Sequence, residues 1–188
     1  MNVYDFDKTI YNGDSTFHFL MYCAKKHASV RRMMPSIAWN GIKYICGILP
    51  KQQFKEGMFS FLTLIDTDKE LGLFWNERIS GIKQWYLERQ KEDDVVISAS
   101  PEFLVRYASE MIGIKYIMAS PVDKNTGKYS GINCHGREKV VRFEQCFPDG
   151  KIDEFYSDSY SDSPLAALAD KAFLVKGNKL LPWRRDKL

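Results

Sequence analysis

Two aspartates, Asp5 and Asp7, stand two positions apart at the end of the first apolar run of the chain, in the stretch MNVYDFDKT. Side chains of a strand alternate between its faces, so these two point the same way and their like charges repel. A second acidic run, SDSYSD at 157–162, follows another short apolar run. Carboxylates gathered in this way fit a hard cation such as Mg²⁺, which takes one or two carboxylates, several waters and a substrate phosphate. The acids therefore predict a site for magnesium and a phosphoryl group.

Groups that would hold a phosphate are also present. Ser98 ends the apolar run VVIS, and its hydroxyl and the backbone N–H groups that follow, beginning at Ala99, face the same edge. A helix predicted to begin near Pro101 adds the positive partial charge of its N-terminus. Lys139, in GREKVVRF, would supply a full positive charge to the phosphoryl oxygens. In such a site a carboxylate can act as the nucleophile and form an aspartyl-phosphate.

The elements that must position these residues follow from apolar runs and helical spacing. Helical patterns, such as 102–112 with a glycine after it, separate most of the apolar runs. This alternation predicts an α/β fold, a three-layer Rossmann-like parallel sheet whose ligands bind beyond the carboxyl ends of the strands. The predicted strands are 2–6, 95–98, 116–119, 155–157 and 172–175.

A long stretch after the first strand has a different character. Residues 15–90 lack strand alternation and are rich in Phe, Met, Leu and Lys. We expect a core formed by residues 1–14 and 91–188, with residues 15–90 inserted as a helical cap. The predicted cap helices are 15–26, 29–48, 51–64 and 69–89; a surface hairpin is predicted at 123–131, and a frayed tail at 183–188.

Composition limits the classes of partner. The chain has 188 residues, 45% of them apolar and 27% charged, and its net charge of +3 is too small to indicate nucleic acid. Its four cysteines form no framework, which favours a reducing, cytoplasmic location. The longest apolar stretch, 36–50, holds Asn40 and Lys43 and is shorter than the ~20 residues of a membrane span, so we expect no stable membrane insertion. Basic residues 25–32 beside it leave weak association with a membrane surface open.

The four segments together resemble the haloacid dehalogenase superfamily of phosphohydrolases. DFDKT resembles its DxDxT signature, VVISAS its strand ending in Ser or Thr, and SDSYSD its acidic GDxxxD segment. Lys139 stands where that family has a phosphate-binding lysine. The four segments occur in the same order as in the family, and together they extend across nearly the whole chain. The helical insert between the first two segments is similar to the C1-type cap of the phosphoserine-phosphatase-like branch, subfamily IB.

The resemblance implies a Mg²⁺-dependent phosphatase acting on a small-molecule phosphomonoester. Asp5 would attack phosphorus, and Asp7 would protonate the leaving oxygen and then activate water. Mg²⁺ would be held by Asp5, the backbone carbonyl of Asp7, and Asp158. Ser98, Ala99 and Lys139 would bind the phosphate, and Thr9 would fix the loop at the phosphate. Asp162 would orient Lys139 or a metal-bound water. Asp14 would contribute to the choice of substrate.

Several points stay open at this stage. Ser100 competes with Ser98 for the phosphate, and we favour Ser98 because it ends the apolar run. Ser157 replaces the usual glycine before Asp158, and Lys8 replaces a small residue. The alternatives to a phosphatase of soluble metabolites are a phosphotransferase, a lipid-phosphate phosphatase or a catalytically silent binding protein. The oligomeric state is not predicted.

Overall fold

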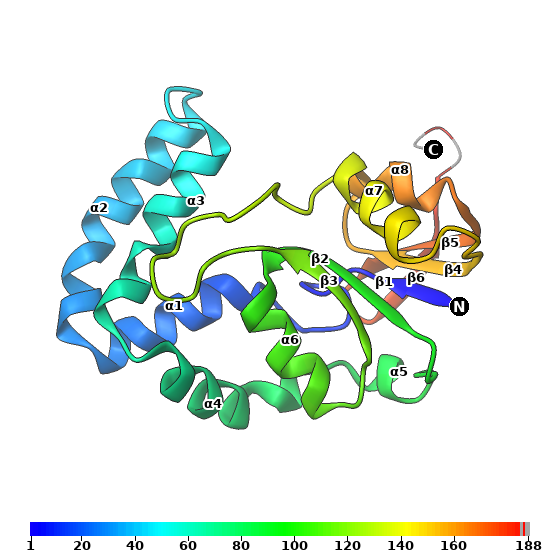
Figure 1. Cartoon of the computed structure of the whole chain (residues 1–188), viewed down its shortest axis with the longest axis horizontal. Helices are drawn as coiled ribbons and strands as arrows, with labels where there is room; N and C mark the ends of the chain where they lie inside the picture. The colour runs from blue at the N-terminus through cyan, green and yellow to red at the C-terminus, as the bar shows by residue number, and fades with distance from the viewer. Residues whose placement is uncertain (185, 187–188) are drawn as a thin grey trace.

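A six-stranded sheet forms the centre of the computed structural model of this chain, which describes residues 1–184 and 186 (Figure 1). The strand order is β3-β2-β1-β4-β5-β6. All neighbouring strands are parallel except β5 and β6, which are antiparallel. The strands are β1 (Asn2–Tyr4), β2 (Val95–Pro101), β3 (Tyr116–Ser120), β4 (Ile152–Ser157), β5 (Ala169–Lys176) and β6 (Lys179–Pro182). The predicted α/β class and its five strands are confirmed, while β6 was not predicted.

Alternation along the strands divides the buried residues between two faces. Val3 pairs in register with Phe155 and both belong to one apolar cluster, whereas Tyr4 pairs with Tyr156 in the other. Helix α6 (Glu102–Met111) packs on β2 and β3, on the face opposite α7 (Arg137–Cys146), as Figure 1 shows. The short α8 (Ser163–Ala166) lies against β4 and β5, beside α7. The result is a three-layer arrangement with helices on both faces of the sheet.

All the helices before α6 lie between β1 and β2 in the sequence. Two of them, α2 and α3, form a hairpin that projects away from the sheet (Figure 1). Their bounds are α1 (Ser15–Lys26), α2 (Ala28–Ile45), α3 (Lys51–Phe59), the 3₁₀ turn η1 (Ser60–Leu64), α4 (Thr67–Arg78), the 3₁₀ turn η2 (Ile79–Gly81) and α5 (Gln84–Leu87). The prediction of 15–26 is confirmed to the residue, and that of 51–64 is replaced by a helix and a 3₁₀ turn.

The single helix predicted over 69–89 is wrong. The chain breaks at η2 because this segment pairs with the loop after β1: Asn12 N–H donates to the carbonyl of Gly81 at 2.8 Å, and Ile82 bridges Tyr11. A Cβ on Gly81 would lie 2.8 Å from the Tyr11 ring, so only glycine allows this approach. The break therefore braces the loop that carries Asp7.

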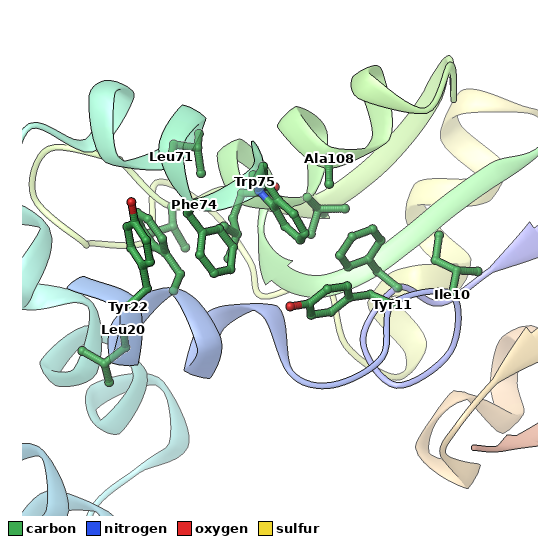
Figure 2. Packing of buried hydrophobic residues seen from close by; sticks show 14 of the residues in the cluster. Ile10, Tyr11, Leu20, Tyr22, Leu71, Phe74, Trp75 and Ala108 are labelled. Carbon is green, nitrogen blue, oxygen red and sulfur yellow. The ribbon is translucent and has the colours of Figure 1, made fainter. Parts of the chain in front are cut away.

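Aromatic side chains join the helical segment to the sheet. Phe74 and Trp75 of α4 lie between Tyr22 of α1 and Tyr11 of the loop after β1, as Figure 2 shows. The rings of Trp75 and Tyr11 meet edge to face with centroids 5.2 Å apart. The indole N–H of Trp75 donates to the carbonyl of Leu104 at 3.0 Å. One continuous apolar cluster thus fixes both α4 and the loop after β1.

The polar stretch 123–131 forms the predicted turn. Val122 and Tyr129 form an antiparallel bridge across it, and Asp123 accepts the N–H of Thr126 at 2.7 Å. Gly127 leaves no room for a side chain, since a Cβ there would lie 2.4 Å from the carbonyl oxygen of Phe59. The turn therefore packs against the end of α3.

The tail prediction is wrong for Trp183. This residue is buried, and its backbone N–H donates to the carbonyl of Ala172 at 2.9 Å. The signal for β6 is the two-residue turn Gly177-Asn178, with φ of 60° at Gly177, a common hairpin connection. Residues 185 and 187–188 of the predicted tail lie outside the described residues.

Candidate active site

Three charged residues from distant segments meet beyond the carboxyl end of β1. Asp5 continues the register of β1, because its N–H donates to the carbonyl of Tyr156 at 2.8 Å. The Lys139 ammonium, in the first turn of α7, donates to Asp5 Oδ1 at 2.7 Å and to Asp162 Oδ2 at 2.8 Å. All three side chains are buried. One cation is thus shared by two carboxylates, which leaves this buried group with an excess negative charge.

Burial and charge perturb the titration of this group. Burial raises the pKa of Asp5 to about 7, although Lys139 opposes the shift; the negative charge of Asp162 adds to it. Burial alone would lower the pKa of Lys139, but the charges of Asp5 and Asp162 outweigh it and leave that pKa raised. Lys139 is therefore ionised at neutral pH, while Asp5 sits in surroundings that favour neutralisation of its charge.

Asp7 lies on the same cavity, held from two sides. Its Oδ1 accepts the N–H of Ser15 at 2.7 Å, at the start of α1, and its Oδ2 accepts the hydroxyl of Ser100. Burial, followed by repulsion from Asp14, raises the pKa of Asp7 to about 6, against the hydrogen bonds from Ser100 and Ser15 that lower it. A carboxyl that titrates near neutral pH is suited to both donating and accepting a proton.

The residues predicted for phosphate binding separate into two groups. Ser98 and Ala99 line the cavity together with Asp5 and Lys139. Thr9 is fully buried behind them and is not among the lining residues; its hydroxyl points to Asp5 Oδ2 at 3.5 Å. The geometry therefore gives Thr9 a contact with the carboxylate and leaves the cavity surface to the other three.

The two competing serines have different partners. The Ser100 hydroxyl donates to Asp7 and accepts from Thr16 at 3.1 Å. The Ser98 oxygen accepts the N–H of Ser100 at 3.1 Å, and its own O–H has no acceptor among the described residues. Ser98 thus retains a donor for a bound anion. Ser100 positions Asp7, a contact that residue spacing did not indicate.

Asp158 completes the predicted metal ligands. It follows β4 and lines the same cavity as Asp5 and Asp7. Burial raises the pKa of Asp158, while the positive charges of Lys8 and Lys176 lower it. Among the described residues no three His, Cys, Asp or Glu side chains form a metal-holding group. Mg²⁺ usually takes only one or two carboxylates, so two carboxylates and the Asp7 carbonyl suit its donor chemistry.

Asp14 and Lys8 lie at the rim of the cavity. Asp14 caps α1, because its Oδ1 accepts the N–H of Phe17 at 2.9 Å. Lys8 is exposed and adopts a left-handed backbone with φ of 57°. Neither side chain is part of the buried charge group.

Two residues that the sequence analysis did not assign support the site. The hydroxyl of Ser157, at the position where the family usually has glycine, donates to Asp162 Oδ2 at 2.7 Å. Lys55 of α3 reaches across the cavity and donates to the carbonyl of Ala99 at 3.0 Å and to Asn133 Oδ1 at 3.2 Å. Burial, followed by the positive charge of Lys51, lowers the pKa of Lys55 to about 8. The helical pattern of α3 was visible in the sequence, but its partner across the cavity was not.

The cavity between these elements has a volume of about 730 Å³. Its floor carries the carboxylates, Ser98 and Lys139, and its outer wall is built by α1, α3 and the end of α2. That outer wall mixes apolar and cationic groups: Phe17, Tyr44, Lys51, Phe54, Lys55, Met58 and Phe59. A cavity of this size accommodates a small organic molecule with one end at Asp5.

The sequence pattern of the haloacid dehalogenase-like hydrolases matches residues 3–167, and the chain belongs to this family. The family predicted from the four sequence segments is thereby confirmed.

Two solved structures are similar in fold, and one further protein is similar over part of the sequence. A protein of unknown function from Bordetella pertussis Tohama I is 19% identical, with a TM-score of 0.76 over 93% of this chain and 88% of that one. A phospho-aspartyl intermediate analogue of phosphoserine phosphatase is 17% identical, with a TM-score of 0.58 over 92% of this chain and 84% of that one. Protein CicA of Caulobacter vibrioides is 28% identical over 83 residues. That match spans 41% of this chain and only 37% of the length of CicA.

Proposed function

We propose that this chain is a Mg²⁺-dependent phosphatase that hydrolyses a small-molecule phosphomonoester through an aspartyl-phosphate on Asp5. The observation that carries the proposal is the buried group of Asp5, Lys139 and Asp162 at the floor of a cavity that Asp7 also lines. Such a group is costly in a folded protein, because two buried carboxylates share one cation. The arrangement is explained if a phosphoryl group binds there, with Asp5 as its nucleophile and Lys139 in contact with its oxygens.

In the first step, the Asp5 oxygen that Lys139 does not hold attacks phosphorus. The P–O bond to the leaving group breaks as the bond to Asp5 forms, and Asp7 gives its proton to the leaving oxygen. In the second step, Asp7 takes a proton from water, whose oxygen attacks phosphorus and releases inorganic phosphate from Asp5. Lys139 and Ser98 bind phosphoryl oxygens, and Asp162 orients Lys139.

The cation would be held by Asp5, the backbone carbonyl of Asp7, and Asp158. When bound, Mg²⁺ supplies positive charge to the carboxylates and to the phosphoryl oxygens. The raised pKa values of Asp5 and Asp158 support this assignment, since each marks a carboxylate whose surroundings favour a compensating positive charge.

We also propose that residues 15–90 act as a cap of the C1 type, which excludes water and selects the leaving group. Two features support this: α3 forms part of the outer wall of the cavity, and Lys55 bridges it to Ala99. Asp14 would contact the leaving group from the rim. A cytoplasmic setting is supported by the four cysteines, all of them unpaired: Cys23, Cys46, Cys134 and Cys146.

A panel of phosphomonoesters with and without Mg²⁺, assayed for released phosphate, tests the proposal. Wild type is expected to hydrolyse at least one substrate only with Mg²⁺, and Asp5→Asn to be inactive on it. Asp149→Asn, a neutralisation at an exposed carboxylate, is the matched control and should keep full activity. Absence of turnover across the panel, or full activity of Asp5→Asn, would contradict the proposal. Product analysis with an added acceptor alcohol separates hydrolysis from phosphotransfer.

A further inference from the structure

The charges of this chain are distributed very unevenly. Residues 15–55 contain no Asp or Glu, although the whole chain has 24 of them. This segment, which covers α1, α2 and most of α3, is therefore purely basic, and the rest of the chain carries all the acidic residues. Its cations are Lys25, Lys26, Arg31, Arg32, Lys43, Lys51 and Lys55.

The same segment exposes large apolar side chains. We call Trp39, Ile42, Ile45 and Ile48 the hairpin tip; they are exposed by 58%, 52%, 83% and 72%, respectively. The first three follow one another at a spacing of three along α2 and continue into the turn before α3. Ile37 of the same helix is buried, in contrast to these exposed residues. Large apolar groups exposed together in this way mark a contact surface.

The hairpin that carries these residues is ordered by its own contacts. The rings of Tyr44 and Phe54, one on each helix, stack with centroids 5.1 Å apart and an angle of 4° between their planes. The Lys43 ammonium lies 5.9 Å from the centre of the Trp39 ring, so a cation accompanies the apolar group at the surface. The tip is therefore presented on a preformed support, and docking requires little further ordering.

We propose that the hairpin tip docks onto the surface of a bilayer that contains anionic phospholipids. Apolar and Trp side chains insert at the boundary between headgroups and acyl chains, while Lys and Arg bind the anionic headgroups. The acid-free composition of residues 15–55 favours this partner over a second copy of the chain, because two such segments repel each other. None of the described helices is both long and apolar enough to cross a membrane.

Docking at the tip would place the bilayer near the cavity. Tyr44, Lys51 and Phe54 belong to the same hairpin and line the cavity wall. The bilayer surface would therefore lie on the side of the molecule where α2 and α3 project (Figure 1). This docking is independent of the proposed phosphatase activity, and each can hold without the other.

Co-sedimentation with vesicles tests the proposal. Wild type is expected to sediment with phosphatidylcholine vesicles that contain phosphatidylglycerol, and not with vesicles of phosphatidylcholine alone. The double variant Ile45→Ser/Ile48→Ser should bind at least about tenfold more weakly than wild type, since two apolar insertions are lost. Ile132→Ser, at an apolar residue that is 67% exposed elsewhere, is the matched control and should bind like wild type. Circular dichroism and activity on a soluble phosphomonoester check that the variants fold.

The basic residues have their own arm of the experiment. Lys43→Gln should weaken binding by about fivefold, because Lys43 lies beside Trp39 in the hairpin tip, and Lys179→Gln should not. Added salt should reduce binding of wild type. The proposal is overturned if wild type does not bind anionic vesicles, or if Ile45→Ser/Ile48→Ser binds as well as wild type. It is also overturned if wild type self-associates without lipid and Ile45→Ser/Ile48→Ser abolishes that association.

Discussion

Replacement of Asp5 by Asn should stabilise the fold at alkaline pH while it removes the nucleophile. Asp5 has a pKa of about 7 in the folded chain, against an ordinary value of 3.8. The folded state therefore holds this proton more tightly than the unfolded state, and stability falls as the pH rises from about 4 to about 7. Above that window the full cost of ionising Asp5 is about 4 kcal/mol.

The pKa of about 7 already includes the attraction of Lys139, so Asn removes this whole cost and loses only hydrogen bonds that its amide makes less well than a carboxyl group. We expect a net gain of about 2 kcal/mol at about pH 8. For a chain of this length, that corresponds to a rise in melting temperature of about 4–8 °C. At about pH 5 much of the ionisation cost is absent from wild type, and the advantage of Asp5→Asn should fall by about 3 kcal/mol, to zero or below.

Urea unfolding of both proteins at the two pH values, with chelator present, measures this difference. Asp149→Asn serves again as the exposed control and should show no comparable pH-dependent change. If Asp5→Asn is less stable than wild type at the higher pH, or if its advantage is the same at both, Asp5 is a structural anchor and the electrostatic reasoning fails.

Three further predictions concern neighbouring residues. Lys139→Met leaves the carboxylates of Asp5 and Asp162 without their cation, so urea unfolding at about pH 8 should show a loss of about 3–5 kcal/mol; a loss below 1 kcal/mol would contradict the shared ion pair. Ser100→Ala removes a hydrogen bond that lowers the pKa of Asp7, so the alkaline limb of the pH–rate profile should move to higher pH, and an unmoved limb would argue against Asp7 as the proton donor. Trp75→Phe removes the buried hydrogen bond from the indole to the carbonyl of Leu104 and should cost about 1–3 kcal/mol of unfolding free energy, whereas an unchanged stability would show that this hydrogen bond is dispensable.

The sheet and the floor of the cavity could be predicted because both follow from local patterns. Apolar runs bounded by charged or turn residues marked five strands, and alternation of side chains placed Asp5 and Asp7 together. The approach of Lys139 to Asp5 rested on a family resemblance rather than on spacing. The structure adds the reason for the contact, since α7 begins where its first turn faces the end of β1.

The rest could not be predicted because it depends on contacts between segments far apart in the chain. The helix break at 79–83 arises from pairing of Gly81 with the loop after β1, which no helical periodicity reveals. In the sequence, Lys55 looks like any lysine on the surface of a helix. Its role follows only from the structure, where it donates to the carbonyl of Ala99. The carboxyl-terminal tail was misjudged because its charged residues outweighed the short hairpin signal at Gly177. In each case tertiary contacts overrode local propensity.

The central claim is that the phosphoryl group passes through Asp5. Rapid acid quench during turnover, followed by proteolysis and mass spectrometry, tests it most directly. We expect one phosphoryl group on the amino-terminal peptide, assigned to Asp5 and absent from Asp5→Asn. A phosphoryl group on another residue, or turnover by Asp5→Asn at the wild-type rate, would contradict the account.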